Sequence, residues 1–258
     1  MAQSTAEKVA ELLLAFESGP AGGPADRSVS ELSRRVGRER SQVSRMLKAL
    51  GQARVVEQDP ETRRYRLGWR VRVMAAGAGD QVLVHAARPM LQALVARTGE
   101  VALLSVQEGN RSLTVMREES QNSLRGGGWV GRRSAMHCTA SGRALLFDAD
   151  DELVEALTST DFGTVPGPAP SSPRDVADLL ERLRLERQQG YALAVEEIEV
   201  GLTSVGVPVR NIQGHLLAVL NVSGPTSRMA RPQVDGAARL LVSASAAVTK
   251  ALSTRQPG

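Results

Sequence analysis

The sequence predicts an α+β fold with a small helical domain at the N-terminus and a larger domain built on an antiparallel sheet. Three observations lead to this prediction. Two short amphipathic segments flank Gly37, an alternating stretch rich in arginine follows them, and strands and helices then interleave without the βαβ alternation of a parallel sheet. We therefore expect a winged helix-turn-helix domain over 1–69, a linker helix over 70–80, and an α/β domain over 81–258.

The two amphipathic segments carry the signals of a helix-turn-helix. Ser28 and Glu31 have the S-x-x-E spacing of a capping box, which starts a helix. Gly37 then supplies the residue best suited to end that helix in the left-handed conformation. The second segment starts at Arg40 or Ser41. Its apolar stripe, at the spacing of a buried helix face, consists of Val43, Met46, Leu47 and Leu50.

The other face of the second helix is basic and contains no acidic residue. It presents Arg40, Ser41, Gln42, Ser44, Arg45 and Lys48. Such a face suits the major groove of DNA, where Arg and Gln form bidentate contacts with base edges. We expect Arg40, Gln42 and Arg45 to contact base edges, and Ser41 and Ser44 to contact phosphates or bases. The alternative is two ordinary surface helices whose charges are only solvated.

A β-hairpin is predicted directly after this helix. An apolar pair precedes an acidic, Pro-containing turn over 58–61, and apolar residues then alternate with arginines over 64–70. A hairpin in this place is a wing, and we expect Arg63 and Arg64 to contact DNA phosphates because wings flank the recognition helix. The alternative is a charged edge strand that resists aggregation, containing Arg63, Arg64 and Arg66.

The rest of the chain is predicted to be an antiparallel sheet with helices packed on its faces. Strands are expected over 101–106, 112–117, 203–210 and 216–223. Helices are expected over 5–16, 82–98, 150–158, 175–189 and 232–252. Pro89 within the second of these predicts a kink or two abutting helices.

The last predicted strand has one wholly apolar face and one face that ends in Asn221 and Ser223. Either this polar patch turns to water, or helices cover both faces and the patch supplies the hydrogen-bonding groups of a mostly apolar pocket. Ser204 on the preceding strand could join the patch across the hairpin. The small residues over 139–142 indicate a close backbone approach to a ligand or to the sheet, and a helix beginning there would direct N–H groups at an anion.

Composition narrows the class of protein without deciding it. The net charge of +4 and the isoelectric point of about 9.8 are compatible with a nucleic-acid partner but too mild to establish one. A single cysteine excludes an intramolecular disulfide and suits a reducing compartment. The N-terminal residues have the pattern of a helix rather than a secretion signal, and no apolar run is long enough to span a membrane. We expect a cytoplasmic protein.

Catalysis and metal binding find little support. The three histidines have no metal-ligand spacing. His137 and Cys138 are neighbours in sequence, so their side chains point apart and do not form a nucleophile pair; Cys138 is expected to be a small buried residue. The adjacent Glu196 and Glu197 are expected at the edge of a helix or loop. The sequence therefore predicts no enzyme, no cofactor and no metal.

Taken together, these segments resemble the IclR family of bacterial transcription regulators over nearly the whole chain. The segment RERSQVSRMLKAL stands at the recognition helix and YRLGW closes the wing. Three further blocks, RRSAMHCTASGRALL, RQQGYALAVEEIEVGLTSVGVPV and AVLNVSGPTSR, are similar to the family's effector-binding domain, which is GAF-like. The sequence departs from the family in two places. Ala194 stands where some members have an acidic residue, so a ligand group that pairs with that residue has no partner here. Residues 38–42, at the start of the recognition helix, differ from the family's usual sequence, so the operator sequence cannot be transferred.

The resemblance implies a dimer or tetramer that binds operator DNA and responds to a small molecule, often a carboxylate. It adds Arg38 to the expected DNA-binding residues named above. The effector-binding positions that it implies are Met136, Ala140, Ser141, Gly142, Leu202, Ser204, Asn221 and Ser223. We thus expect an effector-controlled, DNA-binding transcriptional regulator, more specifically a repressor. The alternatives are a winged-helix protein whose second domain only dimerises, and an enzyme that uses its winged helix for assembly.

Overall fold

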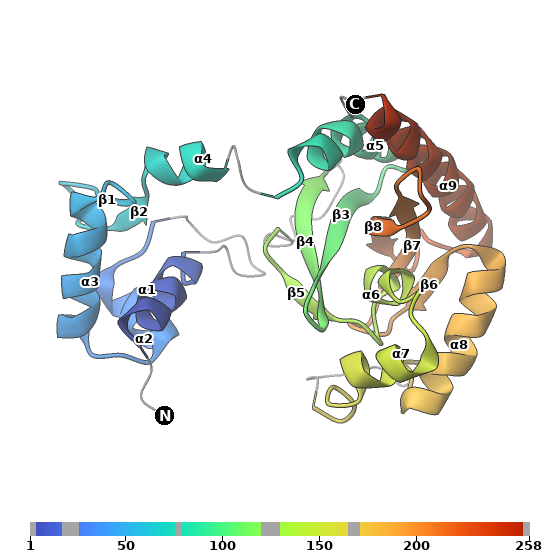
Figure 1. Ribbon diagram of the computed structural model, residues 1–258, viewed down its shortest axis with the longest axis horizontal. Coiled ribbons are helices and arrows are strands. Elements are labelled where there is room, and N and C mark those ends of the chain that lie inside the picture. The colour runs from blue at the N-terminus through green and yellow to red at the C-terminus, as the bar shows by residue number, and fades with distance from the viewer. Residues whose placement is uncertain (1–3, 17–25, 76–78, 120–129, 165–170, 255–258) are drawn as a thin grey trace. The chain divides into compact units, whose positions relative to one another are not determined.

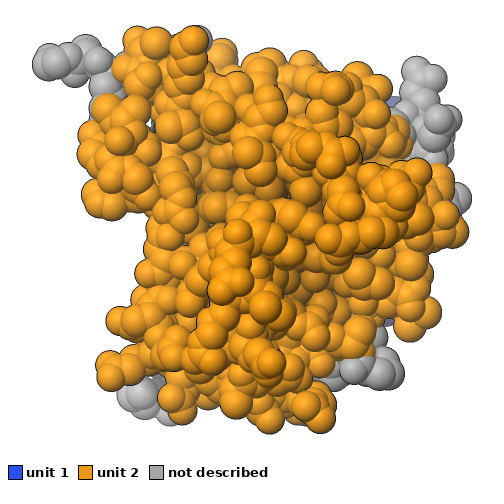
Figure 2. Space-filling model, turned by 90° about the vertical axis from the view of Figure 1, so that its right-hand side faces the viewer, with its two compact units in different colours: residues 1–81, 126–128 blue, residues 82–125, 129–258 orange. Residues whose placement is uncertain are grey.

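The structure is a computed structural model, and its described residues form two compact units. The boundary between the units falls between Gln81 and Val82, and Figure 2 shows the surface of the second unit. Within the described residues, no helix combines the length and the apolar character needed to cross a membrane. The described residues are 4–16, 26–75, 79–119, 130–164 and 171–254.

The first unit is a helix-turn-helix with a two-stranded wing (Figure 1). Its elements are α1 (Thr5–Leu14), α2 (Val29–Val36), α3 (Arg40–Gln52), β1 (Val56–Gln58), β2 (Tyr65–Leu67) and α4 (Trp69–Ala75). The capping box is confirmed, because Glu31 N donates to Ser28 Oγ at 3.2 Å and Ser28 N donates to Glu31 Oε2 at 2.6 Å. Gly37 ends α2 with φ 61°, in the left-handed region as predicted.

The first unit has its own small core. It is formed by Leu12, Phe16, Leu32, Val43, Leu47 and Val56. The alternation predicted over 64–70 stops at Leu67, because Trp69 begins α4 and is 73% exposed. Gly68 makes this change of direction possible: its N–H donates to Val55 O at 2.8 Å, and a Cβ there would lie 2.5 Å from Arg54 O. The linker helix expected over 70–80 is described only as far as Ala75, since 76–78 lie outside the described residues.

An ion pair fastens the wing to α2. Arg64 Nη2 lies 2.8 Å from Glu31 Oε2 and also donates to Asp26 O at 2.9 Å. Hydrogen bonds from Ser28 and from Arg64 lower the pKa of Glu31 from 4.5 to about 2. Both side chains are about one third exposed, so the pair joins the wing to the helix at the surface of the unit.

The second unit is built on a six-stranded antiparallel sheet of order β5-β4-β3-β8-β7-β6. Its strands are β3 (Val101–Glu108), β4 (Arg111–Glu118), β5 (Arg133–Ala135), β6 (Ala192–Val195), β7 (Leu202–Arg210) and β8 (Leu216–Pro225). Its helices are α5 (Gln81–Thr98), α6 (Ala140–Leu145), α7 (Asp151–Thr158), α8 (Val176–Gln189) and α9 (Arg231–Ser253). The short edge strands β5 and β6 were not predicted. Helix α5 continues through Pro89 as a single helix, so the alternative of two abutting helices is wrong.

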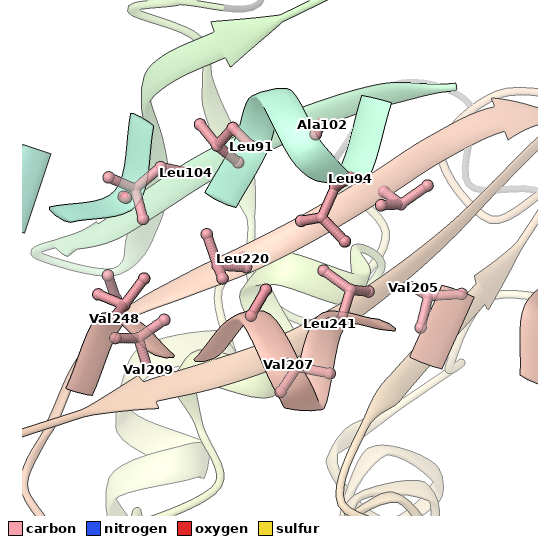
Figure 3. Packing of buried hydrophobic residues seen from close by; sticks show 14 of the residues in the cluster. Leu91, Leu94, Ala102, Leu104, Val205, Val207, Val209, Leu220, Leu241 and Val248 are labelled. Carbon is pink, nitrogen blue, oxygen red and sulfur yellow. The ribbon is translucent and has the colours of Figure 1, made fainter. Parts of the chain in front are cut away.

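Helices cover both faces of this sheet (Figure 1). On one face, α5 and α9 pack against β3, β7 and β8; Figure 3 shows Leu91 and Leu94 of α5 and Leu241 of α9 meeting the sheet at Leu104 and Leu220. On the other face, α6 packs against Val219 of β8 with α7 and α8 behind it. Because side chains alternate along a strand, the residues of β8 on the α6 side are Val219, Asn221 and Ser223.

Helix α6 lies directly on β7 at one glycine. A Cβ on Gly206 would lie 2.8 Å from Ala140 O, so only a glycine permits this approach. The predicted close approach of the small residues over 139–142 is therefore made to the sheet.

We predict that Gly206→Ala destabilises the second unit. The added methyl group would force α6 away from β7, and overpacking of this kind costs about 1–3 kcal/mol. Urea unfolding followed by circular dichroism measures the effect. Gly236→Ala is the matched control, because nothing lies within 4 Å of a Cβ there in α9. Since Ala favours a helix, the control should gain about 0.5–1 kcal/mol; equal behaviour of the two variants would contradict the close approach.

We also predict that Arg64→Ala raises the pKa of Glu31 from about 2 toward its ordinary value of 4.5. The depressed pKa means that this carboxylate stabilises the fold above pH 4.5 and that its contribution disappears as the pH falls toward 2. The variant should therefore be less stable than the parent at neutral pH and lose this part of its acid sensitivity. NMR titration of the Glu31 carboxyl measures the shift. Arg66→Ala is the control, since Arg66 pairs with Glu57 instead.

Candidate DNA interface and ligand cavity

Helix α3 turns its predicted DNA-binding face to solvent. Val43 and Leu47 are fully buried in the core of the first unit. The exposed residues of the helix include Arg40, Ser41, Gln42, Ser44, Arg45 and Lys48. Within the described part of the chain, neither Arg40 nor Arg45 forms an ion pair with another side chain. The guanidinium groups of this face are therefore available to an outside partner.

The other predicted DNA-binding arginines occupy different surroundings. Arg38 lies 2.7 Å from Glu11 of α1 and is 14% exposed, so it fastens α1 to the turn before α3. Arg64 is held by Glu31, as described above. Arg63 is exposed at the wing tip, where its backbone has φ 56°. Of these three arginines, Arg63 is the most exposed, whereas Arg38 and Arg64 are held by acidic side chains.

A hydroxyl-rich cavity lies between the sheet of the second unit and the start of α6. It is lined by Leu103, Ser105, Ser112, Thr114, Ser134, Thr139, Ser141, Ile198, Leu202, Ser204, Asn221 and Ser223. Eight of these side chains carry a hydroxyl and one an amide, and none of the twelve is charged. The cavity volume is about 30 Å³, well below the roughly 300–1,000 Å³ of ordinary small-molecule sites.

The register of the sheet gathers these polar groups. Ser204 lies opposite Ser223 in the β7–β8 ladder, and Leu103 lies opposite Asn221 in the β3–β8 ladder. Ser223 Oγ donates to Asn221 Oδ1 at 3.2 Å. Asn221 is 3% exposed and Ser223 is 6% exposed. The sequence left two alternatives for the face of β8 that carries Asn221 and Ser223. The structure confirms that helices cover both faces of the sheet, so this polar patch does not turn to water.

Five of the eight expected effector positions line the cavity: Ser141, Leu202, Ser204, Asn221 and Ser223. The other three, Met136, Ala140 and Gly142, are not among its lining residues. Met136 and Ala140 are fully buried in the cluster beneath α6. A Cβ on Gly142 would lie 2.4 Å from Met136 Cα, so this glycine allows α6 to pack on its own approach segment.

Sequence reasoning missed the hydroxyls on the other half of the cavity. They belong to Ser105, Ser112, Thr114 and Ser134; Thr139, which also lines the cavity, belongs to the run over 139–142 that the sequence singles out. Ser112 and Thr114 alternate with apolar residues along β4, which was the one available signal. The hydroxyl of Thr139 also caps α6, because it accepts from Gly142 N at 3.0 Å and donates to Ala135 O at 2.9 Å. Helix α6 contains only six residues.

The groups considered for catalysis are buried. Cys138 is inaccessible to solvent, and burial raises its thiol pKa to about 11. Burial lowers the pKa of His137, which is 2% exposed. Glu197, expected at an edge, is instead buried beside Arg143. In the described part of the chain, no three His, Cys, Asp or Glu side chains gather as metal ligands.

Comparison with known proteins covers both units. Residues 5–60 match the IclR helix-turn-helix domain, and residues 77–250 match the family described as bacterial transcriptional regulator IclR C-terminal. The chain is 27% identical to the transcriptional repressor AllR of Salmonella typhimurium, over 99% of this chain and 95% of AllR. It is 29% identical to the transcriptional regulator XynR of Escherichia coli, over 87% of this chain and 88% of XynR.

Two solved structures share the fold. An IclR homolog from Microbacterium hydrocarbonoxydans, complexed with 4-hydroxybenzoate, is 24% identical, with a TM-score of 0.82 over 97% of this chain and all of that one. An IclR transcriptional regulator from Silicibacter sp. is 27% identical, with a TM-score of 0.73 over 96% and 95% of the two chains. The α+β fold predicted from the sequence is confirmed by these structures. The chain belongs to the IclR family of bacterial transcriptional regulators.

Proposed function

We propose that the protein is a homo-oligomeric repressor that binds operator DNA through α3 and responds to a small carboxylate held in the cavity of the second unit. The observation that carries the DNA half is the exposed face of α3, which is basic and free of acidic residues. A solvated, acid-free face that carries Arg, Gln and Ser on the N-terminal part of a helix matches the requirements of the major groove.

The contacts divide into two kinds. Arg40, Gln42 and Arg45 would read base edges, and Ser41 and Ser44 would contact bases or phosphates. Arg63 at the wing tip would add affinity that does not depend on sequence and that weakens with salt. Arg38 and Arg64 act instead by holding the domain together, because their guanidinium groups are engaged by Glu11 and Glu31.

We predict that Arg45→Ala removes sequence-specific DNA binding without lowering the melting temperature. One lost bidentate contact with guanine is worth roughly 1–3 kcal/mol, about 5- to 150-fold in affinity. Selection from a random duplex pool by the parent protein identifies the preferred sequence, and titration of that sequence against a scrambled duplex measures specificity. Arg239→Ala, which removes an exposed arginine from α9, is the charge-matched control. Unchanged specificity in the Arg45 variant would exclude this side chain from base recognition.

The effector half of the proposal rests on the cavity. A carboxylate there would meet hydroxyl and amide donors but no cation from the lining residues. Neutral donors can stabilise an anion when several converge on it. The structure from Microbacterium hydrocarbonoxydans, which holds 4-hydroxybenzoate, makes a hydroxylated carboxylate a reasonable first ligand to examine here.

We predict that Asn221→Ala weakens the response to the effector and leaves DNA affinity without effector unchanged. Asn221 is the one amide among the lining residues, and its loss leaves Ser223 without its hydrogen-bond acceptor. Thermal-shift screening with small carboxylates, 4-hydroxybenzoate among them, detects binding because a ligand specific for the folded state raises the melting temperature. Gln213→Ala, in the exposed turn between β7 and β8, is the control. Equal loss of DNA binding in the Asn221 variant would indicate a structural role.

The remaining parts of the proposal follow from the same surfaces. Repression is supported by the AllR relatives, which are repressors. An oligomer would place two recognition helices on one operator, and the chromosome as target implies the cytoplasm. The buried His137 and Cys138 support a regulator without catalytic activity. If no carboxylate binds while specific DNA binding persists, the second unit serves assembly alone.

A further inference from the structure

The cavity is too small for a metabolite unless one of its walls moves. Its volume of about 30 Å³ is well below the roughly 300–1,000 Å³ of sites that hold small molecules. Two of the described walls are held firmly: the strands by their ladders, and α6 by its direct contact with Gly206. The loop that joins β6 to β7, residues 196–201, is different, since Glu199 and Val200 are exposed, Val200 at 80%.

This loop is anchored at both ends and carries a cavity residue in its middle. Glu196 N donates to Leu202 O at 2.8 Å, and Thr226 N donates to Gly201 O at 2.7 Å. Glu196 and Gly201 both have left-handed backbones, with φ 55° and φ 83°. Between these two anchors, Ile198 lines the cavity. A change confined to the middle of the loop can therefore open or close the cavity while the strands stay in place.

The residue before Ile198 fixes the middle of the loop to the interior. The side chain of Glu197 is 1% exposed. Its carboxylate accepts from Arg143 Nη2 at 3.0 Å and from Arg182 Nη1 at 2.8 Å. Arg143 belongs to α6 and Arg182 to α8, so the loop is held by two helices through one carboxylate.

Arg143 is itself held by several partners. Its side chain has no exposure to solvent, and its Nε lies 3.0 Å from Glu186 Oε2 of α8. Nη1 donates to His137 O at 3.0 Å, and Nη2 donates to Leu193 O at 2.6 Å. All nitrogens of the guanidinium are thus engaged. Loss of Glu197 would still leave Arg143 paired with Glu186.

We propose that Glu197 and Arg143 are positioning residues for the ligand cavity: their ion pair holds Ile198 in the wall and sets how readily that wall opens to admit a ligand. This inference rests on the proposed role of the cavity as the effector site. Neither residue is among those that line the cavity, so both act on the ligand through Ile198.

The movement of Ile198 can be measured without knowing the ligand. The sequence contains a single cysteine, Cys138, which is fully buried and has a thiol pKa raised by burial to about 11. A cysteine introduced by Ile198→Cys would therefore be the one reactive thiol. The rate at which an aromatic disulfide reagent labels it reports how often the wall opens.

The experiment compares the labelling rates of three full-length proteins. The first carries Ile198→Cys alone, the second adds Glu197→Gln, and the third adds Glu199→Gln instead. Glu197→Gln keeps the size of the side chain and removes the charge that both arginines contact. Glu199→Gln makes the same chemical change at an exposed position of the same loop. We expect labelling to be about tenfold faster with Glu197→Gln and unchanged with Glu199→Gln, because one lost ion pair of this kind is worth at least tenfold in an opening equilibrium.

Two results would overturn the proposal. Equal labelling rates with the two Gln variants would show that the ion pair does not hold the wall. Cys138 can be labelled in the Glu197→Gln variant that lacks the Ile198→Cys change. If the reagent labels Cys138 faster there than in the parent protein, the whole unit opens rather than the wall alone. The proposed effector role fails separately, when no carboxylate raises the melting temperature, and that failure leaves the labelling result intact.

Discussion

The fully buried guanidinium group of Arg143 joins several elements of the second unit. Removing Arg143 and its two carboxylate partners from water is costly, and such a cluster persists only where hydrogen bonds satisfy every donor. Here Glu186, Glu197 and two backbone carbonyls do so. The cluster joins α6, α8, β6 and the loop over 196–201, and these elements include part of the cavity wall. The shape of the cavity therefore depends on this cluster as well as on the residues that line it.

The polar groups of the cavity partly satisfy one another's hydrogen-bonding capacity. Ser105 Oγ and Thr114 Oγ1 are 3.4 Å apart, and Ser223 donates to Asn221. Hydroxyls can both donate and accept, so the same groups can turn toward a ligand when one enters. A lysine or arginine in this place would lack that freedom, because a buried cation without a partner is destabilising. Neutral lining residues thus allow a reversible site inside a stable fold.

Local signals predicted the first unit better than the second. The capping box, Gly37 and the stripe through Val43 and Leu47 act within a few residues, and each occurs in the structure as expected. The ion pairs of Arg38 and Arg64 could not be predicted in this way, because their partners Glu11 and Glu31 stand 27 and 33 residues away in sequence. The importance of Arg143 was invisible for the same reason: Glu186 and Glu197 follow it by 43 and 54 residues. Periodicity identifies a face, but only the fold shows what that face meets.

The wall at Ile198 links the affinity for a ligand to the stability of the closed cavity. If the open form is a fraction of the population, the apparent dissociation constant exceeds the intrinsic one by the inverse of that fraction. A tenfold change in opening would therefore change the apparent affinity about tenfold, although no ligand contact is altered. Control of DNA binding needs one thing more, since a ligand shifts an equilibrium only by its different affinities for the two forms. In the proposed effector site, residues remote from the ligand would thus set the concentration at which the regulator responds, while the lining residues would select the molecule.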